Sequence, residues 1–128
     1  MDLVEFLRAR LDRDERIARD CTGHAWRAAP SGRVEADPGP GAGEAVAVAR
    51  AETGAYAEHI ARHHPSRTLA EVAVRRRIVD DYEKQAWVLD QGHRTPELEA
   101  AQAVRENVLR LLALPYATHP AYQQEWRP

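Results

Sequence analysis

Hydrophobic residues recur at helical spacing near the start of the chain. The intervals of three, four and seven residues between them place these side chains on one face of a helix. The stripe consists of Val4, Leu7, Leu11 and Ala18. Asp2 and Glu5 have the spacing of a capping box, in which two side chains bind free backbone N–H groups of the first turn. The pattern predicts a helix over residues 1–20.

The opposite face of this first helix alternates in charge. Asp12 precedes Arg16, and Glu15 precedes Arg19, by four residues each. Pairs at this spacing contribute a few tenths of a kcal/mol each. We therefore expect this face to be a solvated surface that neutralises itself, and not a binding patch.

The helical period is absent from residue 22 to residue 52. Three short segments, HAWRA, RVEA and AVAVAR, are separated by the turn-forming stretches APSG and DPGPGAG. This pattern predicts a small antiparallel meander of two or three strands over residues 22–52, with a Pro/Gly-rich loop at residues 37–43. Trp26 is the largest side chain available to fasten the sheet to the helices.

A helix is predicted over residues 53–63, capped by Thr53. His64 should end it, because a residue that precedes proline disfavours helical dihedral angles, whereas Pro65 suits the first turn of the next helix. The stretch HIARHHPSR is therefore interpreted as a corner between two helices.

The remaining chain is dominated by two long helices, predicted over residues 65–89 and 95–114, with apolar residues at seven-residue spacing. The short loop between them favours an antiparallel helical hairpin. Pro115 stops the last helix, and residues 115–128 should form an irregular tail docked beside the first and fourth helices. The fold class expected is α+β, organised as a single domain over residues 1–128.

Composition narrows the class of protein. The chain has 128 residues, of which 44% are hydrophobic and 30% charged, as in folded globular proteins. Its formal net charge of −2 provides no general basic field for a polyanion. Cys21 is the only cysteine, and the N-terminus lacks the order of a signal peptide. We expect a cytoplasmic protein that does not associate with a membrane.

Two histidines, His59 and His63, stand four residues apart on a predicted helix, a spacing by which two imidazoles can bind one metal ion. The zinc-protease motif requires a glutamate after the first histidine, where this chain has Ile60. A third ligand would have to come from elsewhere in the chain. The candidates are Cys21, His24, His93 and His119. A half-buried histidine at a packing corner is the simpler interpretation, so we predict no cofactor and keep a divalent metal as an alternative.

A run of three arginines, Arg75, Arg76 and Arg77, is the candidate nucleic-acid site. Consecutive residues spread around a helix, so the three side chains cannot all face one ligand. The neighbouring Asp80 and Asp81 likewise point to different faces, which argues against a shared acid–base site. No catalytic residues are predicted.

The tail carries Tyr116, Tyr122 and Trp126, more aromatic surface than a frayed terminus normally has. These residues either pack on the chain's own helices or bind a partner. We favour packing in cis and keep the three residues as the candidate partner-binding site.

Three segments, LVEFLRARLDRDERIAR, HIARHHPSRTLAEV and LRLLALPYATHPAYQQEWRP, resemble an uncharacterised domain-of-unknown-function family of high-GC filamentous bacteria and their phages. The family pattern has aspartate where this chain has His64, and a different entry to the sheet at His24. Both departures speak against a catalytic role for these two histidines. The resemblance implies no established activity.

The leading functional hypothesis is a non-enzymatic accessory or regulatory protein that binds a macromolecule and is carried by a phage or mobile element. A protein partner or a homodimer is expected, and nucleic acid is not the expected partner. The alternatives are a small metal-dependent enzyme that uses His59 and His63, and a nucleic-acid-binding regulator that uses the arginines.

Overall fold

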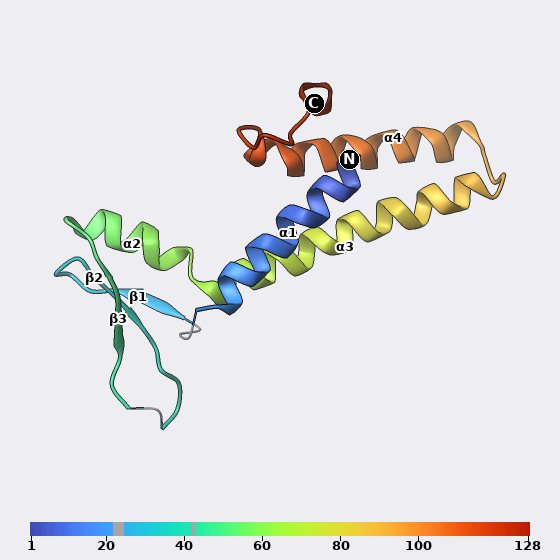
Figure 1. The fold of residues 1–128 in the computed structure, drawn as a ribbon. Coiled ribbons are helices and arrows are strands. Elements are labelled where there is room, and N and C mark those ends of the chain that lie inside the picture. The colour runs from blue at the N-terminus through green and yellow to red at the C-terminus, as the bar shows by residue number, and fades with distance from the viewer. Residues whose placement is uncertain (22–24, 42) are drawn as a thin grey trace. The chain divides into compact units, whose positions relative to one another are not determined.

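The structure, a computed structural model, describes residues 1–21, 25–41 and 43–128. The elements follow in the order α1, three β-strands, α2, α3, α4 and two short 3-10 helices (Figure 1). This order confirms the predicted α+β class. None of the helices in these described ranges has the length and apolar character that crossing a membrane requires.

The chain divides into two compact units. Unit 1 comprises Met1–Asp12 and Ala73–Pro128, and unit 2 comprises Arg13–Val72. The division falls within α1 (Leu3–Arg19) and within α3 (Pro65–Asp90).

Helix α1 begins with the predicted capping box. The backbone N–H of Glu5 donates to Oδ1 of Asp2 at 2.8 Å, and the backbone N–H of Asp2 donates to Oε2 of Glu5 at 2.9 Å. The helix ends at Arg19, one residue before the predicted limit.

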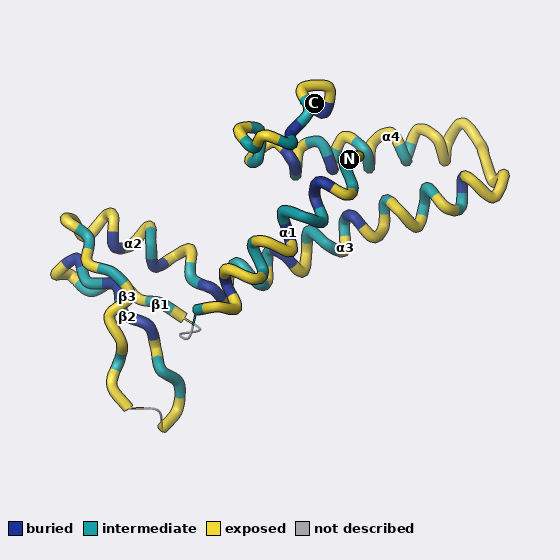
Figure 2. The backbone as a smooth tube through the Cα atoms, viewed as in Figure 1, coloured by how far each residue is buried: buried dark blue, intermediate teal, exposed yellow. Residues whose placement is uncertain are grey.

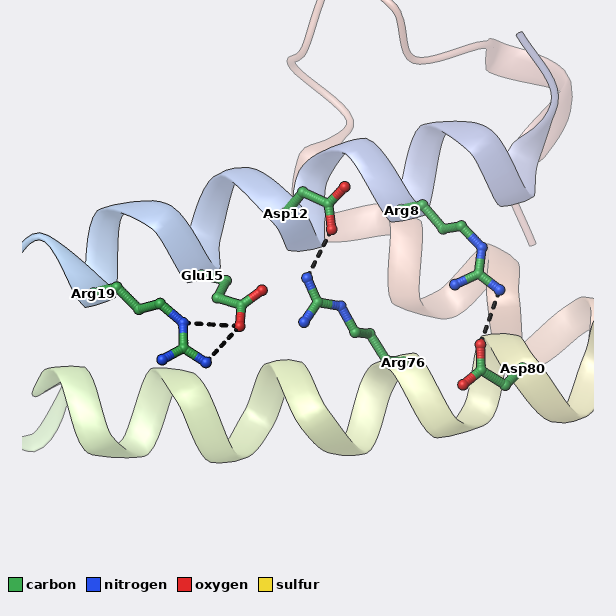
Figure 3. Close-up of polar contacts among 6 residues, drawn as sticks. All are labelled: Arg8, Asp12, Glu15, Arg19, Arg76 and Asp80. Atoms are coloured by element: carbon green, nitrogen blue, oxygen red, sulfur yellow. Dashed lines mark hydrogen bonds and ion pairs between the residues drawn. The ribbon is translucent and has the colours of Figure 1, made fainter.

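The charged face of α1 differs from the prediction in one respect. Glu15 pairs with Arg19 at 2.8 Å, as expected. Asp12, however, pairs with Arg76 of α3 at 2.7 Å (Figure 3), so the predicted pair with Arg16 is wrong. The prediction was wrong because the i,i+4 spacing on one helix gives no information about charged residues on a neighbouring helix.

Arg8 makes a second link between α1 and α3 in unit 1. Its guanidinium donates to Asp80 at 2.9 Å (Figure 3) and also to Glu83. The hydrogen bonds that Arg8 donates to Glu83 and Asp80 raise the pKa of Arg8 above its usual value. In unit 1 this face of α1 is therefore an ion-paired interface with α3.

The core of unit 1 surrounds Phe6, which is fully buried. Residues from α1, α3, α4 and the tail contribute to it, and they appear as the dark segments of these elements in Figure 2. The buried members are Phe6, Leu7, Val79, Leu109, Ala113, Tyr122 and Trp126. The apolar stripe of α1 thus packs inward, as its spacing predicted.

Helices α3 and α4 (Pro96–Ala113) form the predicted antiparallel hairpin. Thr95 caps α4 by accepting from the backbone N–H of Leu98 at 3.1 Å. Across the hairpin, Nε2 of Gln102 donates to the carbonyl of Tyr82 at 3.1 Å. Gly92 adopts a φ of +91°, the left-handed conformation that turns the chain after α3.

Unit 2 contains a three-stranded antiparallel sheet in the order β1 (Trp26–Ala28), β2 (Arg33–Ala36), β3 (Val46–Arg50). The predicted meander is thus confirmed with three strands, although residues 22–24 and residue 42 of the expected sheet region lie outside the described residues. Gly32 has a φ of +87°, and a Cβ there would lie 2.3 Å from the carbonyl oxygen of Ala51. Only glycine therefore fits this turn between β1 and β2.

Helix α2 (Gly54–Arg62) packs against β1 and β2. Thr53 caps it, as predicted, by accepting from the backbone N–H of Tyr56 at 3.3 Å. The buried cluster beneath α2 consists of Val34, Ala57 and Ala61, and Trp26 packs against it while remaining half-buried. The small size of these residues lets α2 lie close to the sheet.

The tail continues from α4 without an abrupt stop. Helix α4 ends at Ala113, and the 3-10 helix η1 (Leu114–Tyr116) includes Pro115. A second 3-10 helix, η2 (Gln124–Trp126), follows near the C-terminus. Nε2 of Gln123 donates to the carbonyl of Met1 at 2.9 Å, so the tail reaches the start of α1.

Candidate functional site

The histidine pair lies on α2 and at its end. The ring centroids of His59 and His63 are 4.5 Å apart, and the rings are tilted by 41°. Nδ1 of His63 is 2.8 Å from the carbonyl oxygen of His59, so this nitrogen donates to the backbone. A metal could therefore approach His63 only at Nε2.

The other potential ligands are dispersed. Sγ of Cys21 donates to the carbonyl of Ile17 at 3.5 Å. His119 in unit 1 accepts from the backbone N–H of Ala121 at 3.1 Å and also contacts Arg10. His24 lies outside the described residues, and within the described ones no group of three or more His, Cys, Asp or Glu side chains could hold a metal ion.

The arginine run lies on α3, and its members have different surroundings. Arg76 is directed to Asp12 at 2.7 Å, whereas Arg77 is exposed. The adjacent carboxylates also diverge, since Asp80 pairs with Arg8 at 2.9 Å and Asp81 with Arg105 at 3.0 Å. The ion pairs thus hold these neighbouring charges in separate directions.

The aromatic residues of the tail gather around Phe6. Tyr122 and Trp126 retain 7% and 6% of their exposed area, and Tyr116 is half-buried. The centroids of Phe6 and Trp126 are 5.1 Å apart, and Tyr122 meets Trp126 edge-on at 5.7 Å. Burial of this extent leaves little of Tyr122 and Trp126 for a partner to contact.

A pocket of about 480 Å³ lies beside this cluster in unit 1. Its lining includes Asp2, Tyr82, Glu106, Arg110 and Trp126. Burial raises the pKa of the Tyr82 phenol, and the nearby carboxylates of Glu106 and Asp2 raise it further. The pocket is negatively charged, and Arg110 occupies part of it by pairing with Glu106 at 2.8 Å.

Unit 2 contains a larger, open groove of about 770 Å³ between β1, the β1–β2 turn, α2 and the start of α3. Its apolar floor is formed by Trp26, Pro30 and several alanines. Its polar rim consists of Arg27, Glu58, Arg62, His64 and Arg67. We consider this groove the candidate functional site because it combines apolar surface with clustered guanidinium groups.

Two of the three arginines on the rim are held in place by carboxylates outside the groove. Arg27 pairs with Glu35 across the sheet at 3.2 Å, and Arg67 pairs with Glu71 along α3 at 2.8 Å. Arg62 is exposed and makes no side-chain ion pair within the described chain. Its charge is therefore available to a ligand.

The start of α3 adds to the positive potential of the groove. Nδ1 of His64 accepts from the backbone N–H of Arg67 at 3.3 Å, so His64 caps the helix. The N-terminus of a 26-residue helix carries partial positive charge, and α3 has no acidic residue in its first turn to offset it. Groove and helix end thus favour a ligand with negative charge.

The sequence did not predict the groove. The sequence indicates only a structural role for Trp26. Arg27, Arg62 and Arg67 belong to three different elements, so their spacing in the sequence does not predict a shared site. The available signal was the pair Arg62 and Arg67, which flank the His64–Pro65 corner. Only the packing of α2 on the sheet brings Arg27 beside them.

Comparison with known families gives a match over the whole chain. The family described as "Family of unknown function (DUF6221)" matches residues 1–128. The chain belongs to this family. The predicted resemblance to a domain-of-unknown-function family is thereby confirmed. A search of curated proteins and a search of solved structures each gave no match. Membership of DUF6221 assigns no activity to the groove.

Proposed function

We propose that the protein is a non-enzymatic accessory or regulatory factor that binds an acidic segment of a protein partner in the groove of unit 2. The observation that carries this proposal is the composition of the groove. Its rim has three arginines and the N-terminus of α3 but a single described carboxylate, Glu58, and its floor is apolar. Arginine and tryptophan are the residues enriched at the energetic centres of protein interfaces.

A peptide fits the groove better than a nucleic acid does. Two of the three guanidinium groups are already paired with glutamates, which leaves Arg62 as a single unpaired cation on the described rim, fewer than the several contacts that a phosphate backbone uses. The chain also has a formal net charge of −2, which opposes non-specific binding of a polyanion. An acidic segment with interspersed apolar residues can place carboxylates on the rim and apolar side chains on the floor.

No covalent chemistry is required by the groove. Among the described residues that line it there is no serine, threonine, cysteine or lysine. The proposed activity is therefore binding alone. We also propose, as the sequence led us to expect, that the protein is carried by a phage or mobile element.

The direct test is fluorescence anisotropy with a labelled peptide of alternating glutamate and leucine, and with a single-stranded oligonucleotide of equal charge. We expect the peptide to bind more tightly, and Arg62→Glu to weaken it at least about tenfold, equivalent to about 1.4 kcal/mol. Arg16→Glu on exposed α1 makes the same change in net charge and serves as the control. Tighter binding of the oligonucleotide would favour the nucleic-acid alternative. Equal effects of Arg62→Glu and Arg16→Glu on peptide binding would exclude the groove as the binding site.

The natural partner can be identified by co-purification from the native host. The wild-type protein and Arg16→Glu should retain the same partner, whereas Arg62→Glu should lose it. A partner retained by all three proteins binds elsewhere on the chain.

A metal-dependent enzyme that uses His59 and His63 is the second candidate, favoured by the 4.5 Å separation of the two rings. Elemental analysis of protein purified without a metal-affinity tag distinguishes it from a binding protein. Stoichiometric zinc, manganese or iron that disappears in His63→Ala would support the enzyme, and protein without these metals would exclude it.

A further inference from the structure

Strand β3 is an edge of the sheet in unit 2. It pairs with β2 on one side, and the strand order β1-β2-β3 leaves its other side without a strand in the described part of the chain. The second edge, β1, packs against α2. Unpaired N–H and C=O groups at such an edge can pair with an added strand.

The side chains of β3 do not protect this edge. Proteins usually block exposed edges with lysine, proline or inward-pointing charges. The strand has the sequence VAVAR, and its two valines, Val46 and Val48, are 60% and 39% exposed. Exposed β-branched residues on an edge strand favour pairing with another strand.

The charges that flank the valines are arranged symmetrically about Ala47. Glu44 lies three residues before Ala47, and Arg50 lies three residues after it. Glu44 lies in the bend before β3, and in an antiparallel pair that is centred on Ala47 and extended back to this residue, Glu44 of each copy is opposite Arg50 of the other. Val46 of each copy is then opposite Val48 of the other, so the segment is complementary to itself in both charge and shape.

We infer that β3 pairs with β3 of a second copy of this chain, antiparallel and centred on Ala47. Two three-stranded sheets then join into one continuous sheet across a two-fold axis. The occupant is a second copy, because the segment itself supplies both opposite charges and both valines at matching positions. Val34 is opposite Ala49 and Glu35 is opposite Ala47, so Val48 is the extra residue of a bulge on β3, and it increases the local twist of the strand.

A charge exchange tests the pairing. The mass of wild-type particles should approach twice the 14.4 kDa chain mass in sedimentation equilibrium as concentration rises. Glu44→Arg and Arg50→Glu should each raise the dissociation constant at least about tenfold, because each places like charges opposite one another. The double variant Glu44→Arg/Arg50→Glu restores both pairs and should restore dimerisation. A wild-type protein that stays monomeric at millimolar concentration, or a double variant as weak as the single ones, would overturn the inference.

A disulfide tests the register independently. In a Cys21→Ser background, Ala47→Cys places two thiols opposite one another at the two-fold axis, where opposite Cα atoms lie about 4.5–5.5 Å apart, within disulfide range. Mild oxidation at low protein concentration should yield covalent dimers. Ala55→Cys, on the exposed surface of α2, is the matched control. Equal cross-linking of both variants indicates random collision and contradicts the proposed register, and circular dichroism verifies that each variant is folded.

Discussion

Single side chains determine where the helices of this protein begin. Thr53, His64 and Thr95 each accept a hydrogen bond from a backbone N–H in the first turn of the following helix, and Asp2 does the same at α1. An imidazole is an unusual cap, since Ser, Thr, Asp and Asn are preferred at this position. His64 is therefore the cap at which substitution has the clearest expected effect.

His64→Asp should leave the protein as stable or make it more stable by about 0.5–1 kcal/mol, because a carboxylate both accepts the hydrogen bond and interacts favourably with the positive end of α3. Urea denaturation monitored by circular dichroism measures the difference. His64→Ala is the control, and it should lose about 1 kcal/mol with the cap. A loss of more than about 1 kcal/mol in His64→Asp would show that the imidazole makes another specific interaction.

The phenol of Tyr82 should make stability depend on pH in the alkaline range. Because its pKa is raised in the folded protein, the folded state keeps this proton at pH values where the unfolded chain has lost it. The protonated phenol therefore makes its full contribution to the free energy of unfolding below the unfolded pKa of about 10. This contribution is lost as the pH rises through the folded pKa of Tyr82. Tyr82→Phe should show a shallower fall in unfolding free energy between about pH 9 and pH 11 than the wild type. Equal slopes in the two proteins would contradict the assigned pKa shift.

At the scale of elements, the sequence predicted each α-helix to within one or two residues and also the meander, but not the two 3-10 helices of the tail. Caps, prolines and apolar spacing are local signals, so a single segment of sequence is enough to predict where a helix begins and ends. The partner of Asp12 was not predicted, because it depends on how α1 and α3 are rotated about their axes. The groove was missed for the same reason, since Arg27 and Arg62 meet only through the packing of α2 on the sheet.

The tail is an element whose stability rests on aromatic burial. Trp126→Ala should lower the unfolding free energy by about 3–5 kcal/mol, the usual cost of truncating a buried tryptophan, and expose the tail to proteases. Trp87→Ala is the control, because Trp87 is 63% exposed and its loss should change stability little. Thermal denaturation and limited proteolysis measure both effects. Unchanged stability in Trp126→Ala would contradict packing of the tail in cis and would favour the alternative, in which the tail binds a partner.

At the scale of the whole molecule, no linker separates the two units. The division falls inside α1 and inside α3, and both helices are continuous across it. Domain boundaries usually fall in exposed, flexible segments instead. The continuity of the two helices leads us to predict that the two units unfold together.

We predict a single cooperative unfolding transition for the 128-residue chain. Breaking either helix at the division would remove intrahelical hydrogen bonds from both units, so one unit should not unfold without the other. Differential scanning calorimetry should give equal calorimetric and van't Hoff enthalpies. Two resolved transitions would show that the units unfold independently.

The hydrogen bond between Gln123 and the carbonyl of Met1 places the tail of unit 1 against the start of the chain. Chain ends that lie close together can be joined by a short linker, and new ends can be opened in an exposed loop. The Pro40–Gly41 bond lies in such a loop, where a Cβ added at Gly39 or Gly41 would meet no neighbouring atom. A circular permutant opened there would turn β1 and β2 into the C-terminal strands and make β3 the first element to leave the ribosome, with the amino-acid composition otherwise preserved.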